Sequence, residues 1–199
     1  SHDIAGIELS QRNFYGTLKV YVDEGRGYKT MQHGQISHGS QFTDPAKAQD
    51  PTTYYVRESG VGQAILVKSQ SSEPIKVGVV GLGVGTLAGY ARKGDVYRFY
   101  EINPEVIDAA KKHFTFLSNS AASIDHVLGD ARLRLEQEPN QQFDVLVIDA
   151  FSGDSVPIHL LTKEAFTQYF RHLKSDGILA LHITCLLYTS DAADEGLGV

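Results

Sequence analysis

The chain has few of the residues that stabilise small secreted proteins. It has 199 residues with one cysteine, Cys185, and no tryptophan. One cysteine excludes a disulfide framework and a cysteine-based zinc site, and it fits a reducing, cytoplasmic compartment. No stretch reaches the roughly 18–20 apolar residues that a membrane helix needs, so we expect no direct membrane insertion.

Basic clusters are also absent. The 18 Lys and Arg residues are scattered, and the formal net charge is −6. A nucleic-acid-binding surface needs a basic stripe that neutralises phosphates, so we expect no nucleic-acid partner. A mildly acidic protein is better suited to a small cationic molecule.

Neither end of the sequence resembles a natural terminus. The first four residues lack methionine and the basic and apolar regions of a signal peptide, so the true beginning is expected to be missing. Residues 185–199 change abruptly to a small, acidic, aperiodic segment that resembles a translated sequencing adaptor. We interpret it as a non-native or disordered tail, and expect the preceding fold to be truncated at its C-terminal end.

Residues 1–70 predict a small β-rich domain. Residues 14–22 alternate as a strand does, residues 23–27 form a turn, and residues 28–31 look like the return strand of a hairpin. Residues 59–69 carry apolar side chains at helical spacing, with Ser59 as an N-cap. The first part is therefore expected to be a β-hairpin region with a connecting helix.

Residues 71–184 predict an α/β domain. Apolar strand-like runs alternate with helical segments in this part of the chain, which indicates βαβ units. The expected strands are 75–80, 96–100, 124–128, 143–148 and 178–183, and the expected helices are 85–92, 104–113, 131–137 and 162–173. The fold class is therefore a doubly wound, mostly parallel sheet with helices on both faces.

A glycine-rich turn follows the first of these strands. Gly81, Gly83 and Gly85 let the backbone turn tightly and approach a ligand without a Cβ in the way. Glu101 ends the next strand, 20 residues after Gly81, where a carboxylate accepts hydrogen bonds from ribose hydroxyls. The turn and the acid together predict a nucleoside site.

The spacing of the turn bears on which nucleoside binds. The dinucleotide pattern is G-x-G-x-x-G, whereas this turn reads G-x-G-x-G and resembles motif I of S-adenosylmethionine-dependent transferases. A nicotinamide cofactor and tight packing without a ligand are the alternatives. Asp130, followed by Ala131, ends the third strand; it fits an adenine contact, the N-cap of the next helix, or both.

A second acidic turn follows the strand at 143–148. Asp149 stands at the carboxyl end of that strand, and Asp154 lies five residues further along a glycine-containing loop. Ligands of open α/β sheets bind outside the carboxyl ends of the strands. Carboxylates there can attract an ammonium group, orient an amine and accept its proton. The alternative is that Asp149 caps the strand and Asp154 is solvated.

Four segments together resemble the spermidine synthase family of polyamine aminopropyltransferases: residues 77–85, 100–103, 129–131 and 143–157. The preceding β-rich region resembles that family's small N-terminal β-domain. Residues 30–41 and 51–55 look most similar to the soluble spermidine synthase-like domain of bacterial membrane-fused proteins.

This resemblance implies roles for individual residues. Glu101 would bind the ribose of decarboxylated S-adenosylmethionine, and Asp130 with Ala131 would bind its adenine. Asp149 would serve the aminopropyl end and the attacking amine, and Asp154 is the second acid of this turn, displaced by two positions from its place in the family. Tyr54 would line the amine tunnel, and Gln41 matches the family's gatekeeping glutamine. Tyr55-Val56 stands where the family has His-Glu after the tyrosine.

The resulting hypothesis is a transferase that moves an aminopropyl group from decarboxylated S-adenosylmethionine to a di- or polyamine. The alternatives are an S-adenosylmethionine-dependent methyltransferase and a non-catalytic nucleoside- or polyamine-binding domain. No metal is required, and His33 and His38 without a third ligand make a poor metal site. We expect a cytoplasmic location, including that of a cytosolic domain of an inner-membrane protein; a homodimer is left open.

Overall fold

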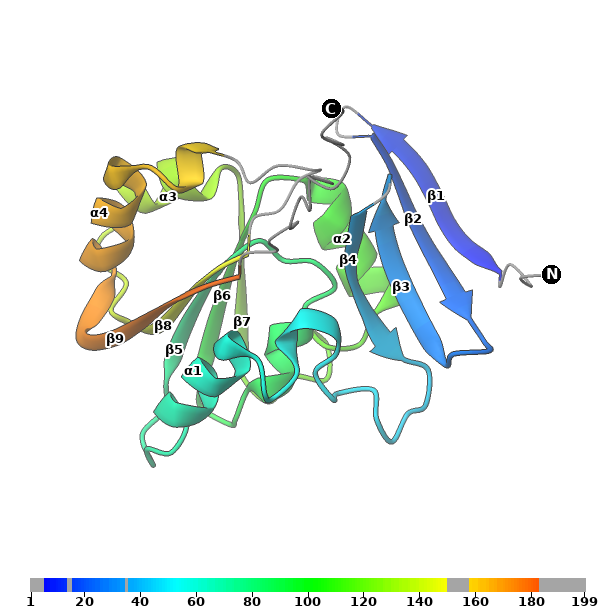
Figure 1. Cartoon of the computed structure of the whole chain (residues 1–199), viewed down its shortest axis with the longest axis horizontal. Coiled ribbons are helices and arrows are strands. Elements are labelled where there is room, and N and C mark those ends of the chain that lie inside the picture. Colours follow the sequence, from blue (N-terminus) through cyan, green and yellow to red (C-terminus); the bar gives the residue numbers. More distant parts are fainter. Residues whose placement is uncertain (1–5, 14–15, 35, 150–157, 183–199) are drawn as a thin grey trace, which may run out of the picture.

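A computed structural model describes residues 6–13, 16–34, 36–149 and 158–182 (Figure 1). The predictions for Asp154 and for the tail at 185–199 lie outside these ranges. Two sheets lie side by side, and α2 stands between them. No helix within the described ranges is long and apolar enough to cross a bilayer.

The N-terminal sheet is a four-stranded antiparallel meander. Its strands follow one another in chain order: β1 (Ile7–Asn13), β2 (Gly16–Asp23), β3 (Tyr28–His33) and β4 (Ile36–Phe42). The predicted hairpin is confirmed, because β2 pairs with β3 from Leu18–His33 to Asp23–Tyr28. Strand β1 was not predicted, although Ile7 and Leu9 alternate with polar residues as in a strand with one buried face.

The second sheet is parallel throughout. Its order is β7-β6-β5-β8-β9, with β5 (Lys76–Val80), β6 (Val96–Glu101), β7 (Ser123–Leu128), β8 (Phe143–Ile148) and β9 (Leu173–Leu181). The chain runs outward from β5 to β7, then returns to the other side of β5 with β8. The order therefore reverses between β5 and β8, and a doubly wound sheet opens its ligand crevice at such a point.

Helices cover both faces of the parallel sheet, as predicted. They are α1 (Gly60–Lys68), α2 (Pro104–His113), α3 (Ala131–Gln137) and α4 (Lys163–Arg171), with short 3₁₀ turns η1 (Thr53–Tyr55), η2 (Thr86–Tyr90) and η3 (Ile158–Leu160). Side-chain caps begin all four helices: Ser59, Asn103, Asp130 and Thr162 each accept a hydrogen bond from a first-turn N–H.

The helix predicted at 85–92 is a 3₁₀ turn instead. It starts only after Gly85, whose φ of 85° is left-handed, and it ends before the extended Ala91. Gly89 lies so close to the carbonyl oxygen of Gln49 that a Cβ on it would stand 2.5 Å away. The segment is therefore confined between the glycine turn and the loop before η1.

One core joins the two sheets. Leu18, Val20 and Met31 of the N-terminal sheet belong to the same buried cluster as α1, α2 and one face of the parallel sheet. A second cluster fills the space between the opposite face and helices α3 and α4. The N-terminal sheet is thus packed on the parallel-sheet domain, and β4 reaches its glycine turn.

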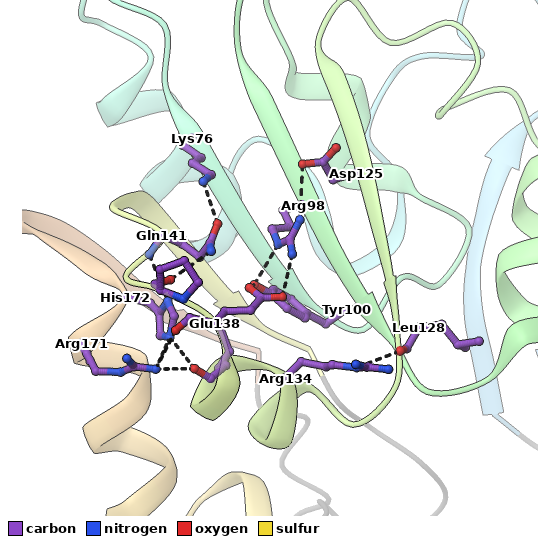
Figure 2. Close-up of polar contacts among 12 residues, drawn as sticks. Lys76, Arg98, Tyr100, Asp125, Leu128, Arg134, Glu138, Gln141, Arg171 and His172 are labelled. Atoms are coloured by element: carbon purple, nitrogen blue, oxygen red, sulfur yellow. Dashed lines mark hydrogen bonds and ion pairs between the residues drawn. The ribbon is translucent and has the colours of Figure 1, made fainter.

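A polar network lies on the face covered by α3 and α4 (Figure 2). Arg98 Nη2 donates to Glu138 Oε1 at 2.6 Å, and the Tyr100 hydroxyl donates to Glu138 Oε2 at 2.7 Å. Nearby, His172 Nδ1 accepts from the Gln141 N–H at 3.1 Å, while its Nε2 lies 2.7 Å from the Leu135 carbonyl. Burial lowers the pKa of His172, which fits this neutral tautomer.

We expect Glu138→Gln to lower the free energy of unfolding by about 3 kcal/mol, because it leaves the largely buried Arg98 guanidinium with only its longer, 3.5 Å contact to the half-exposed Asp125. The side chains of Arg98 and Glu138 are only 21% and 15% exposed. Glu136→Gln is the matched control, since its pair with Arg132 is 37% and 29% exposed, and its loss should cost less than about 1 kcal/mol. Urea unfolding measures both, and equal losses would contradict the prediction.

Candidate active site

The two turns predicted from the sequence meet where the strand order reverses. The Gly81 N–H donates to the carbonyl of Tyr100 on β6, and the Asp149 N–H donates to the carbonyl of Val80 on β5, both at 2.8 Å. The glycine turn therefore begins beside the carboxyl end of β6, and the turn at Asp149 begins beside the carboxyl end of β5. The structure brings the glycine turn, Glu101 and Asp149 to one edge of the sheet.

Two glycines of the turn have protein neighbours that require glycine. Gly83 has a φ of 55°, and a Cβ on it would lie 2.5 Å from the carbonyl oxygen of His38 in β4. Gly85 has a φ of 85°, and its Cβ would meet Leu117 Cδ2 at 2.7 Å. Strand β4 is held against the turn because the Val84 N–H donates to that same His38 carbonyl at 3.2 Å. The tight-packing alternative thus explains part of the glycine pattern.

Glu101 supports the turn directly. Its Oε2 accepts from the Leu82 N–H at 3.0 Å, and its Oε1 accepts from the Asn103 N–H at 2.9 Å. Burial raises the pKa of this carboxyl, and the backbone N–H donors oppose that rise. These two hydrogen bonds and the Ile102 N–H, a third backbone donor, use three of the carboxylate's four acceptor positions, so it can still accept from a ligand hydroxyl.

Asp130 begins α3, and the structure gives it a second partner. Its Oδ1 accepts from the Leu133 N–H at 3.0 Å, which confirms the N-cap. Its Oδ2 lies 3.0 Å from Nε2 of His159 in η3, a contact that the sequence did not predict. Ala131, the first residue of the helix, is buried.

Apolar side chains remain exposed around these acids. Ile102 follows β6, Leu128 ends β7 one register position away, and Leu133 lies in the first turn of α3; all three are about half exposed. Exposed apolar groups beside polar ones are typical of a ligand surface. A flat purine ring can cover such a surface while Asp130 accepts from its amino group.

Asp149 is the most perturbed acid in this group. Burial raises its pKa to about 7, from an ordinary value near 4. Within the described ranges, no Lys, Arg or His forms an ion pair with it. A partly buried carboxylate with a pKa near neutrality, at the strand-order switch of the sheet, is a candidate proton acceptor.

Tyr54 lies at the same edge, in η1. Its ring is 4.8 Å from the ring of His182, centroid to centroid, and the buried Tyr55 ring is 5.7 Å from it. The His182 N–H donates to the Ile148 carbonyl at 3.0 Å, directly before Asp149. The expected last strand includes His182, whereas β9 ends at Leu181; a histidine just beyond a parallel strand was the available signal.

Gln41 and the two histidines lie on the N-terminal sheet. The Gln41 amide nitrogen donates to the Ala48 carbonyl and to Thr115 Oγ1, both at 2.8 Å, and its oxygen accepts from the Thr115 N–H. Because both amide hydrogens are used, the predicted ligand contact of Gln41 gains no support. His33 and His38 have ring centroids 5.6 Å apart, and burial lowers the pKa of His38 to about 4.

Comparison with known proteins points to one group. A polyamine aminopropyltransferase of Vibrio vulnificus is 27% identical in an alignment of 198 positions that covers 92% of this chain. A probable spermidine synthase from Corynebacterium glutamicum has the same fold, with a TM-score of 0.69 over 89% of this chain and 18% identity. The resemblance to the spermidine synthase family is confirmed.

The remaining comparisons set the limits of that resemblance. Spermidine synthase from Thermotoga maritima has a TM-score of 0.59 over 88% of this chain and 55% of its own, with 17% identity. The chain spans 62% of the Vibrio relative and 63% of the Corynebacterium structure. An N-terminal histidine N-methyltransferase of Emericella nidulans is 32% identical over 109 residues, 52% of this chain and 19% of that protein. No protein-family model matches the chain.

We expect Gly83→Ala to destabilise the chain and weaken nucleoside binding, because a Cβ at residue 83 must push β4 away from the turn. Gly34→Ala is the control: its φ of 60° is similar, but no atom lies within 4 Å of the added Cβ. The control should cost about 1–2 kcal/mol from backbone strain alone, and Gly83→Ala about 1–3 kcal/mol more. Unfolding midpoints and calorimetric titration with methylthioadenosine measure both effects; equal costs would contradict the packing argument.

Proposed function

We propose that the chain is the catalytic part of an aminopropyltransferase that uses decarboxylated S-adenosylmethionine and a di- or polyamine. The observation that carries the proposal is the partly buried Asp149, with its raised pKa, beside the glycine turn at the strand-order switch. The similarity to the Vibrio enzyme over nearly the whole chain supports it.

In this proposal the nucleoside lies across the carboxyl ends of β5, β6 and β7. Glu101 accepts from a ribose hydroxyl through the acceptor position that its backbone donors leave unused. The adenine packs on Ile102 and Leu128, with Asp130 and Ala131 at its amino edge. Because His159 lies 3.0 Å from Asp130 Oδ2, its ring must share that oxygen or move when the adenine binds.

Asp149 stands beside the reacting end. The amine nitrogen attacks the methylene carbon next to the sulfonium, a carbon–nitrogen bond forms, and the carbon–sulfur bond breaks. The bonding electron pair goes to sulfur, and methylthioadenosine leaves as a neutral thioether. The proton released by the attacking nitrogen goes to the Asp149 carboxylate, whose pKa near 7 suits that transfer at neutral pH.

The same carboxylate favours the decarboxylated donor. Ordinary S-adenosylmethionine carries a carboxylate on the chain that would lie near Asp149, and two buried like charges repel. A site for the ordinary donor would need a nearby cation, and none of the described Lys or Arg residues pairs with Asp149.

Two other functions keep specific support. Methyl transfer is favoured by the similarity to the Emericella N-methyltransferase, which covers half of the chain. Binding without catalysis is favoured by Tyr55-Val56, which stand where the family's His-Glu pair is expected. The products distinguish the three: methylthioadenosine, S-adenosylhomocysteine, or none. Fusion to a membrane domain, a cytoplasmic location, a homodimer and the role of Asp154 remain predictions.

The first test is turnover. The protein is incubated with decarboxylated S-adenosylmethionine and putrescine or spermidine, and methylthioadenosine is quantified. Asp149→Asn should lower kcat by about 10²–10⁴-fold, since it removes a proton acceptor, and the activity of the unaltered protein should rise with pH through about 7. Nucleoside binding without turnover for any amine would refute the proposal.

The second test is stability against pH. The pKa of Asp149 is higher in the folded state than in the unfolded chain, so its contribution is fully present below about pH 4 and is lost as pH rises through about 7. Asp149→Asn should therefore be more stable than the unaltered protein at pH 8, by up to about 4 kcal/mol, and the gain should vanish near pH 4. Urea unfolding at both pH values checks this, and a loss at pH 8 would contradict it.

A further inference from the structure

A histidine contacts the acid that begins α3. His159 Nε2 lies 3.0 Å from Asp130 Oδ2, and the two side chains are 50% and 22% exposed. A carboxylate accepts hydrogen bonds and donates none, so the hydrogen between these two atoms belongs to the imidazole Nε2. The contact joins η3 to the start of α3, and its two residues are 29 positions apart in the sequence.

The two partners are fixed by separate elements, in a region where α3 and α4 lie side by side (Figure 1). Asp130 caps α3, because its Oδ1 accepts from the Leu133 N–H at 3.0 Å. Next to His159, Leu160 is buried in the cluster between the sheet and α4, and its carbonyl accepts from the Tyr169 hydroxyl at 2.9 Å. His159 therefore belongs to a turn that α4 anchors, and its ring reaches across to α3.

These hydrogen bonds orient the Asp130 carboxylate and leave it acceptor capacity. The terminal torsion of an aspartate is broad, so a single hydrogen bond restricts it weakly. Here Leu133 holds Oδ1 and His159 holds Oδ2, and together they fix the plane of the carboxylate. Of its about four acceptor positions, one on each oxygen stays unused. The unused lone pairs therefore have set directions before a ligand binds.

We propose that His159 is a positioning residue for purine recognition: it holds the Asp130 carboxylate so that a remaining lone pair accepts from the 6-amino group of the adenine. This inference rests on the proposed function, which places the adenine at Asp130. It adds that His159 stays on Oδ2 when the nucleoside binds. The preference for a 6-amino purine then depends on a residue that acts through Asp130.

The surroundings of the pair suit this role. Leu128 and Leu133 lie close to Asp130 in the sequence, Ile158 precedes His159, and all three side chains are exposed. A purine that covers them removes water from the carboxylate and strengthens the hydrogen bond from its amino group. An acceptor that is oriented in advance also loses less conformational freedom on binding. A ligand without the amino group leaves the desolvated acceptor unpaired and is rejected for that reason.

Calorimetric titration with two nucleosides tests the inference. One is methylthioadenosine, and the other is its analogue with hydrogen in place of the 6-amino group. His159→Ala removes the donor and should weaken methylthioadenosine binding by about 5- to 10-fold, with the affinity for the analogue within about 2-fold of the unaltered protein. His159→Gln retains an N–H near the position of Nε2 and should recover most of the methylthioadenosine affinity.

Two further variants separate this role from a structural one. In Asp130→Asn, the added change His159→Ala should cause no further loss, because Asp130 is the group through which His159 acts. His113→Ala is the matched control. His113 Nδ1 lies 3.3 Å from Glu8 Oε2, in a second histidine–carboxylate pair that joins α2 to β1, and its loss should leave both nucleoside affinities unchanged.

Turnover gives an independent measurement. His159→Ala should raise the KM for decarboxylated S-adenosylmethionine and leave kcat within about 2-fold, because the base is held equally in the ground state and the transition state. A fall in kcat without a rise in KM would contradict the positioning role.

The outcomes distinguish this inference from the proposed function. An equal loss for both nucleosides would overturn the inference, since His159 would then act only on the fold. An unchanged methylthioadenosine affinity in His159→Ala would overturn it as well, even if turnover occurs. Binding that depends on His159, without methylthioadenosine release for any amine, would support the inference and refute the transferase proposal. No methylthioadenosine binding by the unaltered protein would overturn both.

Discussion

The partial burial of one carboxylate, Asp149, is the constraint on which the site depends. It lies where the order of a parallel sheet reverses, so its backbone is fixed by β5 and its neighbours come from β8 and β9. Partial desolvation by the surrounding protein raises its pKa to about 7. A surface aspartate would stay ionised at neutral pH and would be a poor proton acceptor; here the fold supplies the needed basicity and loses some stability for it.

The glycine turn has two roles that the sequence pattern alone could not separate. Gly83 and Gly85 have no room for a Cβ, because His38 and Leu117 of the protein itself lie against them. Glu101 accepts from the turn and keeps an acceptor position for a hydroxyl. The turn is thus fixed before any ligand arrives, and a preformed turn binds with a smaller loss of conformational freedom than one that must fold on binding.

The parallel-sheet domain could be predicted because its signals are local. Helices α2 and α3 have the predicted bounds, since Asn103 with Pro104 and Asp130 mark their starts. The central strands β5 and β8 are apolar runs buried on both faces, whereas the edge strand β7 is partly exposed. Strand β1, the 3₁₀ turn η2 and the full length of β9 were missed, because pairing and close packing with distant segments determine them. Among site residues, Glu101 and Asp149 could be predicted because each comes directly at the end of an apolar strand. His159 and His182 could not, because only folding brings them to Asp130 and Tyr54.

Strand β4 and the glycine turn interlock at residues 39 and 84. A Cβ on Gly39 would stand 2.9 Å from Val84 Cγ2, and its φ of 119° already favours glycine. The two positions therefore share one small volume, although residue 39 lies on β4 and residue 84 lies in the glycine turn after β5. Among homologous sequences, residue 39 should become larger only where residue 84 becomes smaller. Covariation of this pair would therefore reflect how the N-terminal sheet packs against the glycine turn.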